Sequence, residues 1–365
     1  MEEKNSAKAK HQQHQEHSKK FKNGEKQSPV DETEAAGCLA SRVGESHVGY
    51  IASRTGGSSW VCRRSHWRHP PLSILRGHIA TASDNTPFSP PLPPLAMADK
   101  KALLQLKKDL GNPYIITSWN AKEDCCDWYC CVECDEKTNR IISIGISSSI
   151  PDANASGQIP PSVGDLPYLE SITFHKLPNL VGPIQPTIAK LTKLKSLFIT
   201  YTNISGPIPA FLGQLKNLEL IKLSFNNLSG PIPNCLISGP IPASLGNLNP
   251  DRVDLSRNKL EGDASMLFSS KKTTQILDLS RNKFEFDLSH LTFPKQSLIW
   301  LDLNHNNIYG NIPVALTTVK YLQQFNVSYN PRLSGKIPQG GELQRFDKYA
   351  YFHTKLCGSP LPPCK

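Results

Sequence analysis

The chain has 365 residues, of which 38% are hydrophobic and 20% are charged, a composition typical of soluble proteins. Its formal net charge of +10 is spread along the sequence, and this diffuse charge argues against nucleic acid as a partner. No apolar run approaches the roughly 18 residues that a membrane-spanning helix needs, so we expect no such span.

The first part of the chain, residues 1–97, has the composition of unfolded polypeptide. Residues 1–36 are rich in Lys, Glu, Gln and His and are expected to be disordered. Residues 37–97 are rich in Arg, Ser and Pro and end in a proline run typical of an extended linker. We expect no domain here. The first 20 residues are too polar for a signal peptide, which raises the hypothesis that the translated protein begins near Met97.

A cap is expected over residues 98–141. Leu103, Leu106 and Leu110 recur at helical spacing, and Gly111 then provides a stop, so this stretch predicts an amphipathic helix. A cluster of cysteines follows it. Helix and cluster together can cover the open hydrophobic end of a stacked repeat array.

From residue 142 the sequence is periodic. The stretches Val253–Gly262, Leu277–Phe286 and Leu301–Gly310 superpose at a spacing of 24 residues and share the frame LxLxxNxL. This period and frame are typical of leucine-rich repeats, an α/β repeat architecture that we expect to form a right-handed solenoid over residues 142–346. Eight strands are predicted: Ile142–Ser148, Glu170–Lys176, Lys195–Tyr201, Glu219–Phe225, Asp251–Arg257, Gln275–Arg281, Ile299–His305 and Gln323–Tyr329.

An asparagine follows most of these strands and can bond backbone groups of neighbouring coils, so we expect a stacked ladder. Its members are Asn226, Asn258, Asn282, Asn306 and Asn330.

One interval, the junction at residues 228–250, breaks the period. Leu223 and Leu255 are 32 residues apart, and the motif LSGPIP that begins at Leu228 recurs nine residues later as ISGPIP. One interpretation is an internal deletion, about two repeats shortened by 16 residues; the other is an insertion of eight residues, which repeat proteins tolerate.

Cysteines and glycosylation sequons indicate an oxidising, extracellular compartment. Five of the ten cysteines lie within Cys125–Cys134, and Cys357 and Cys364 close the chain, which predicts disulfide-stapled caps, the second over residues 347–365. The expected glycosylation sites are Asn154, Asn203, Asn227 and Asn326.

Residues that alternate with the inward leucines face solvent on the concave side and form columns along the solenoid. Three aspartates in one column make a negative stripe suited to a basic patch, and apolar residues exposed on one face favour a protein interface. The opposing hypothesis is that the aspartates are repeat consensus, neutralised by Arg257 and Arg281. The predicted partner-binding residues are Phe198, Tyr201, Lys222, Phe225, Asp254, Asp278, Trp300, Asp302 and His305.

The sequence gives no sign of catalysis. The aspartates lie on one strip rather than on opposed walls of a cleft, and no nucleophile-elbow, phosphate-loop or zinc-protease motif is present. Cys131 and Cys134 have the spacing of half a zinc site, but no second pair accompanies them, so disulfide capping is preferred. We expect no enzyme activity, no cofactor and no metal.

Residues 98–365 resemble plant polygalacturonase-inhibiting proteins, a secreted leucine-rich-repeat family. The stretches that carry the resemblance include KKALLQLKKDLGNPY, SWNAKEDCCDWYC, LDLSRNKFEFDLS and YFHTKLCGSPLPPCK. The resemblance implies plant defence in the cell wall, with a concave face that binds and blocks fungal endo-polygalacturonase, and association with pectin. The alternative is a pectin-binding or receptor-partner wall protein that has lost inhibition.

The chain departs from this family in its cysteines and its length. The family has a cysteine before the first helix that is absent here, so Cys125 lacks its usual partner. The cysteine cluster Cys125–Cys134 also has one residue more than the family pattern. Cys126 can therefore pair with Cys134 or with Cys131, and the pairing of Cys130 stays open, whereas Cys357 and Cys364 can still close. Family members also have more repeats than the eight strands counted here.

Overall fold

The computed structural model divides into two units, Met1–Arg76 and Gly77–Lys365. In the first unit, β1 (Tyr50–Ser53) pairs antiparallel with β2 (Val61–Arg64), inside the segment where no folded structure was expected. The other residues of 1–97, for which disorder or a linker was predicted, lie outside the described residues, except residues 94–97 at the start of the first helix of the second unit. The structure describes residues 50–53, 61–64, 94–128, 131–148, 155–232 and 245–365.

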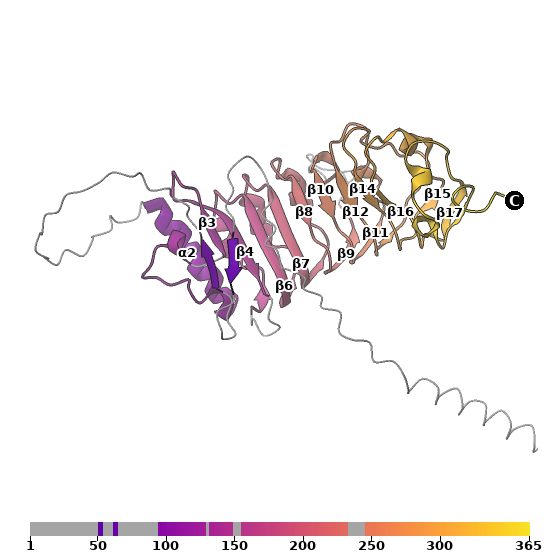
Figure 1. The fold of residues 1–365 in the computed structure, drawn as a ribbon. Helices are drawn as coiled ribbons and strands as arrows, with labels where there is room; N and C mark the ends of the chain where they lie inside the picture. The colour runs from indigo at the N-terminus through magenta and orange to yellow at the C-terminus, as the bar shows by residue number, and fades with distance from the viewer. Residues whose placement is uncertain (1–49, 54–60, 65–93, 129–130, 149–154, 233–244) are drawn as a thin grey trace, which may run out of the picture. The chain divides into compact units, whose positions relative to one another are not determined.

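The second unit is a leucine-rich-repeat solenoid, and the predicted concave sheet is confirmed (Figure 1). Its eight strands pair in parallel, each with the strand of the next coil, as the 24-residue period requires. They are β4 (Ile141–Ser147), β6 (Ser171–Gly182), β7 (Ser196–Gly206), β8 (Leu220–Lys222), β10 (Arg252–Asp254), β12 (Ile276–Asp278), β14 (Trp300–Asp302) and β16 (Gln324–Asn326).

Each coil continues from the concave strand into a second parallel sheet. This sheet begins with β5 (Gly157–Gln158) and the long strands β6 and β7, and it continues through short strands. These are β9 (Asn227–Pro231), β11 (Lys259–Gly262) and β13 (Lys283–Phe284), while β15 (Tyr309–Gly310), β17 (Arg332–Lys336) and β18 (Lys355–Cys357) form a separate group.

Most coils return through a short 3-10 turn, in several cases just after a proline, because proline fixes the φ angle of a turn and lacks the N–H that a strand needs. These turns are η3 (Pro161–Asp165), η4 (Pro186–Lys190), η5 (Ala210–Gln214), η6 (Leu245–Asn247), η7 (Ser265–Leu267) and η8 (Val314–Thr318).

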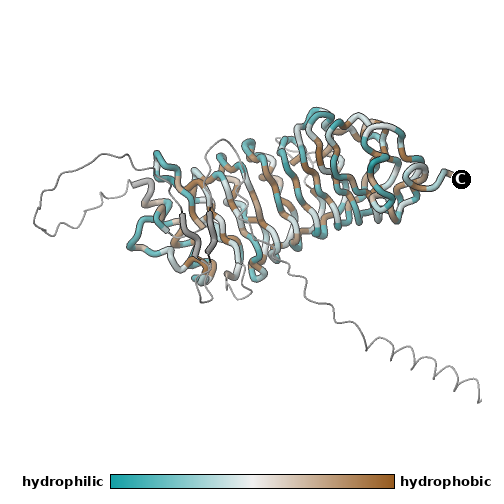
Figure 2. The backbone as a smooth tube through the Cα atoms, viewed as in Figure 1, coloured by the Kyte–Doolittle hydropathy of each residue, from teal (hydrophilic) through white to brown (hydrophobic). Residues whose placement is uncertain are grey.

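The core is a stack of apolar side chains inside the coils. Figure 2 shows hydrophobic residues recurring at similar places along successive coils. In the coil of β12, Leu277 and Leu279 are 3% and 0% exposed, whereas Asp278 between them faces outward. This alternation follows from the strand period of two, and it fixes which side chains line the concave surface.

The asparagine ladder forms as expected. Asn330, which is fully buried, donates from Nδ2 to the carbonyl oxygens of Leu303 (3.0 Å) and Val327 (2.9 Å), and its Oδ1 accepts from the backbone N–H of Ile308 (3.0 Å). Asn226, Asn258, Asn282 and Asn306 make equivalent bonds. The ladder therefore satisfies backbone groups that the tight turn after each strand would otherwise leave unpaired.

The junction at residues 228–250 leaves both sheets continuous. β8 pairs directly with β10, with Leu220 opposite Arg252 and Lys222 opposite Asp254. On the second sheet, β9 pairs directly with β11. The strands before and after the junction are thus direct neighbours in both sheets, and residues 233–244 between them lie outside the described residues.

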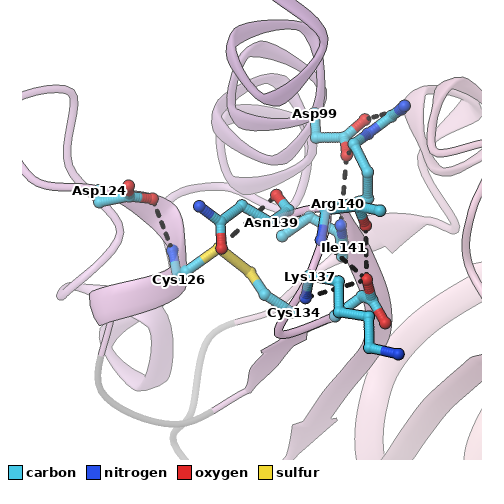
Figure 3. Close-up of a disulfide and its surroundings, with 10 residues drawn as sticks. Asp99, Asp124, Cys126, Cys134, Lys137, Asn139, Arg140 and Ile141 are labelled. Atoms are coloured by element: carbon cyan, nitrogen blue, oxygen red, sulfur yellow. Dashed lines mark hydrogen bonds and ion pairs between the residues drawn. A yellow bond between two sulfur atoms is a disulfide. The ribbon is translucent and has the colours of Figure 1, made fainter. Parts of the chain in front are cut away.

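The N-terminal cap joins a helix to the first repeat. The helix α2 (Pro94–Asp109) begins four residues before the expected boundary; its Leu103 and Leu106, and Leu110 directly after its end, are completely buried. Its Asp99 accepts from Arg140 Nε at 2.7 Å and from Arg140 Nη2 at 2.8 Å, and also from the backbone N–H of Ile141 at the start of β4 (Figure 3).

The expected disulfides are present in both caps. Cys126 is bonded to Cys134, which lies in β3 (Val132–Cys134), a strand that pairs antiparallel with β4 and covers the sheet edge (Figure 3). The alternative partner, Cys131, is not used for this bond. At the other end Cys357 is bonded to Cys364.

The C-terminal cap continues the coil geometry for one more step. This cap contains the 3-10 turns η9 (Leu343–Arg345) and η10 (Lys348–Tyr351). Val327 N–H donates to the carbonyl oxygen of Ala350 in η10, and Tyr329 N–H donates to that of Phe352, both at 2.8 Å. These bonds place the segment around Phe352 beside β16, as a further coil would lie.

Candidate partner-binding face

The register of the concave sheet confirms the expected column of outward-facing residues. Pairing runs from strand to strand without a shift across these positions, so equivalent side chains lie side by side. In order the column is Thr173, Phe198, Lys222, Asp254, Asp278, Asp302 and Asn326. Adjacent members are separated by the strand spacing of about 4.8 Å.

Three consecutive carboxylates form what we call the acidic row: Asp254, Asp278 and Asp302. Each uses Oδ1 to accept the backbone N–H two residues further on, at 3.0 to 3.1 Å. This local bond holds every carboxylate in the same orientation, because the bond depends only on the backbone of its own coil.

The acidic row is partly desolvated. The pKa of Asp278 is raised to about 6, chiefly by burial and in smaller part by the neighbouring Asp302 and Asp254, against the lowering effect of its bonds to Ser280. Burial also raises the pKa of Asp302, which Asp254 raises too and Arg281 lowers. Parallel carboxylates one strand apart repel each other, so the row favours a cation above it.

Among the described residues no arginine forms an ion pair with the row, and Arg281 acts on Asp302 only through its charge. Asp254 lies 3.8 Å from Lys222 Nζ, and its Oδ2 accepts from the Ser224 hydroxyl at 3.0 Å. Asp278 and Asp302 have no ion pair among the described residues. The guanidinium of Arg257 lies instead over the Phe225 ring, 4.7 Å from its centroid.

A second column, which we call the rim row, follows the end of each concave strand. All its members adopt a left-handed backbone with φ between +53° and +56°, although none is glycine. They are Lys176, Tyr201, Phe225, Arg257, Arg281, His305, Tyr329 and His353. Sequence analysis missed His353, which the 24-residue spacing from Tyr329 would have identified.

The rim row contains two stacks of rings. Tyr201 and Phe225 stack with centroids 3.9 Å apart, and His175 contacts the edge of Tyr201. At the other end, Tyr329 is stacked on His305 at 4.0 Å and lies 4.5 Å from His353. Burial lowers the pKa of His305, and the nearby Arg281, Arg257 and His353 lower it further.

The aromatic residues expected to be exposed divide into two groups. Tyr201 and Trp300 are 43% and 38% exposed, as predicted. Phe198 and Phe225 are only half-buried rather than freely exposed, because Phe225 is covered by Tyr201 and Arg257, and Phe198 lies within the sheet. Trp300 occupies the same strand and face as Asp302, so an apolar contact adjoins the acidic row.

The cap cysteines offer little metal chemistry. Asp124, Cys125 and Cys126 lie close enough to share an ion, but the sulfur of Cys126 is held in its disulfide. Cys125 is a buried free thiol, and burial, together with Asp124, raises its pKa to about 11. A thiol this hard to ionise is a poor metal ligand or nucleophile. Cys130 falls outside the described residues.

Three of the four expected glycosylation sites can be placed, while Asn154 lies outside the described residues. Asn203 in β7 is exposed, and Asn227 in β9 and Asn326 in β16 are half-buried. Among the described helices, none is long and apolar enough to cross a membrane.

Comparison with known proteins places this geometry in a family. Residues 97–135 match the model of the leucine rich repeat N-terminal domain, and residues 217–239 and 297–318 match that of the leucine rich repeat. A polygalacturonase inhibitor of Pyrus communis is 52% identical over 309 residues, which cover 73% of this chain and 91% of that protein. The chain belongs to the polygalacturonase inhibitor family.

A second inhibitor and a solved structure are also similar to this chain. Polygalacturonase inhibitor 2 of Arabidopsis thaliana is 51% identical over 310 residues, covering 73% of this chain and 92% of that inhibitor. Among solved structures, the crystal structure of PEPR1-AtPEP1 is similar with a TM-score of 0.53 and 25% identity, covering 71% of this chain and 34% of that one.

The match to the Pyrus communis inhibitor spans 309 positions but draws on 73% of 365 residues, roughly 266, so roughly 40 positions of the match have no counterpart here, close to two 24-residue repeats. The chain is therefore shorter than that relative over the matched region.

Proposed function

We propose that this chain inhibits fungal endo-polygalacturonase by binding the enzyme through its concave sheet. The observation that carries the proposal is the acidic row, where Asp278 and Asp302 face solvent without an ion pair among the described residues. It lies in a chain 52% identical to a polygalacturonase inhibitor.

Inhibition of this kind needs no chemistry from the inhibitor. A basic patch of the enzyme would approach the acidic row, and Trp300 beside Asp302 would supply apolar contact area at the centre of the interface. Opposite charges would orient the encounter, and the bulk of the solenoid would then obstruct the approach of a long pectin chain to the enzyme's cleft.

The proposal also includes the localisation of the protein. Two disulfides, one in each cap, are suited to an oxidising compartment, so we infer an extracellular protein of the plant cell wall. A role in defence follows from the proposed target. The open concave surface that the described coils form is suited to binding another protein.

The experiment is inhibition of a panel of fungal endo-polygalacturonases by the oxidised full chain, after cooperative unfolding has shown that the protein is folded. Saturable, stoichiometric inhibition of at least one enzyme is the expected result. If a demonstrably folded sample inhibits none of them at micromolar concentration, the proposal is wrong.

Pectin binding is the second candidate, and the rim row favours it. Arg257 and Arg281 are exposed in consecutive coils, next to His305, and could hold uronate carboxylates. Because exposed cations are screened by salt, affinity for polygalacturonate should then collapse between 50 and 500 mM NaCl, over which the Debye length falls from about 14 Å to about 4 Å. Binding to a receptor ectodomain would be the remaining possibility if neither pectin nor enzyme binds.

A further inference from the structure

In the coil of β14, a buried asparagine joins the acidic row to the rim row. Asn304 is 8% exposed and lies between Asp302 and His305 in the sequence. Its Nδ2 donates to Asp302 Oδ1 at 2.5 Å, and its Oδ1 lies 2.6 Å from Nδ1 of His305. One amide group thus contacts a side chain of each row.

The other two coils of the acidic row have a different pair of residues at these positions. There the equivalents of Asn304 are Ser256 and Ser280, each followed by an arginine of the rim row. The Ser256 hydroxyl donates to Asp254 Oδ1 at 2.7 Å, which uses its single proton. An amide, by contrast, offers a donor and an acceptor on separate atoms. Asparagine and histidine therefore replace serine and arginine together in the coil where the acidic row ends.

The partners of this amide fix the position of the proton on His305. An ionised Asp302 can only accept, so the amide must turn its nitrogen toward the carboxylate and its oxygen toward the imidazole. An amide oxygen can also only accept, so Nδ1 of His305 must donate. In the neutral ring the other nitrogen, Nε2, then has no proton and is a hydrogen-bond acceptor.

The imidazole of His305 is held in place and is favoured in its neutral form. It stacks on Tyr329 with the ring centroids 4.0 Å apart, which fixes the plane of the ring. The pKa of His305 is lowered, chiefly by burial and in smaller part by the positive charges of Arg281 and Arg257. Nε2 makes no hydrogen bond to the described residues and is not one of their buried polar atoms, so it is accessible to a partner.

We propose that Asn304 is a positioning residue, which holds His305 with Nδ1 protonated so that Nε2 accepts a hydrogen bond from the enzyme beside Asp302. The use of this acceptor by an enzyme rests on the proposed function. Oδ2 of Asp302 likewise makes no hydrogen bond to the described residues, so this end of the acidic row presents two acceptors. The matching group on the enzyme is a positively charged donor, an arginine or a lysine.

The position of the proton on His305 can be measured by nuclear magnetic resonance. In the full chain labelled with nitrogen-15 histidine, at pH 8, the protonated and the bare nitrogen of a neutral imidazole give separate signals. The signals of His305 are those missing from the spectrum of His305→Phe. We expect Nδ1 to be protonated in the wild type.

The variant Asn304→Ser should release the ring without disturbing the acidic row. Its hydroxyl can donate to Asp302 as Ser256 donates to Asp254, but no amide oxygen then remains for His305. We expect the proton to move to Nε2, the position that imidazole side chains prefer in water. Serine occupies the equivalent place in the two preceding coils of the row, so the variant should fold.

Inhibition of a sensitive endo-polygalacturonase gives the second readout. Phe225 occupies a rim position of the same backbone geometry, so His305→Phe should keep the ring stack while removing both nitrogens. Since each change removes or misplaces one hydrogen bond, the inhibition constant should rise about fivefold for His305→Phe and about threefold for Asn304→Ser. The double variant should be no worse than His305→Phe, because Asn304 acts through His305. Asn307→Ser, an exposed change on the same coil, is the control and should alter neither readout.

A proton on Nε2 of His305 in the wild type would overturn the inference, and so would an Asn304→Ser variant that keeps Nδ1 protonated. Additive effects of the two substitutions on inhibition would also contradict it, since the asparagine would then act independently of His305. The spectra involve no enzyme. A chain with Nδ1 protonated that inhibits no enzyme would therefore contradict the proposed function and the use of Nε2 with it, whereas a proton on Nε2 in an inhibitory chain would contradict this inference alone.

Discussion

At the scale of single residues, the charges of the acidic row destabilise the folded protein but favour the binding of a basic partner. Asp278 is held among like charges and partly desolvated, and its pKa of about 6 shows that the folded protein resists ionising it. Such a group persists where a partner benefits from it. A single substitution that removes the charge of Asp278 should therefore raise the stability of the protein and at the same time weaken its binding to the partner.

We expect Asp278→Asn to stabilise the protein at neutral pH. The amide keeps an oxygen that can accept from Ser280 N–H but carries no charge, so the free energy of unfolding at pH 7 should rise by about 1–3 kcal/mol. Denaturant titration measures this change. The same variant should inhibit the enzyme less well, and loss of stability with full inhibition would contradict both expectations.

The pH dependence of this effect has a fixed sign. Below pH 3.8 the carboxyl is protonated in the folded and unfolded chain alike, so the wild type has no penalty there. Between pH 3.8 and about 6 the unfolded chain ionises first, and wild-type stability falls relative to Asp278→Asn. The difference in melting temperature should be near zero at pH 3.5 and largest above pH 6.5, as measured by calorimetry.

At the scale of elements, the ladder and the N-terminal cap hold the solenoid in register. The strands, their inward leucines and the ladder could all be predicted from the sequence, because the 24-residue period repeats the same side chain at the same backbone position. The start of α2 at Pro94 and the pairing of β1 with β2 could not, because neither segment takes part in the period.

Asn330→Ala should be strongly destabilising. It removes four hydrogen bonds to the backbone and leaves buried carbonyl oxygens unpaired, so we expect a loss of about 2–5 kcal/mol in denaturant titration. Asn307→Ala, at an exposed position beside the ladder residue Asn306, is the control and should change stability by less than about 0.5 kcal/mol. Similar losses in both variants would show that the ladder is not needed.

Breaking the ion pair of the cap should destabilise the first repeats. The side chains of Asp99 and Arg140 are 1% and 6% exposed, so Asp99→Ala leaves a buried guanidinium without its carboxylate and should cost about 3–5 kcal/mol. Hydrogen exchange should locate the loss in α2 and β4. Lys101→Ala, an exposed change on the same helix, should leave exchange unaltered.

At the scale of the whole molecule, the shortened array keeps a continuous concave sheet. β8 and β10 meet in register across the junction, so Lys222 adjoins Asp254 and the acidic row follows directly. The columns could be predicted from the period, but the burial that raises the pKa of Asp278 and the stacking of Tyr201 on Phe225 could not, because they depend on how neighbouring coils pack.

The most direct test of the account is inhibition of one sensitive endo-polygalacturonase by two charge-matched double variants. Asp278→Asn with Asp302→Asn removes two of the three charges of the acidic row, whereas Glu261→Gln with Glu285→Gln removes the same charge from exposed positions in β11 and directly after β13. We predict at least a tenfold rise in the inhibition constant for the first, about 1.4 kcal/mol, and less than a twofold change for the second. Equal inhibition by both variants would contradict recognition through the concave acidic row.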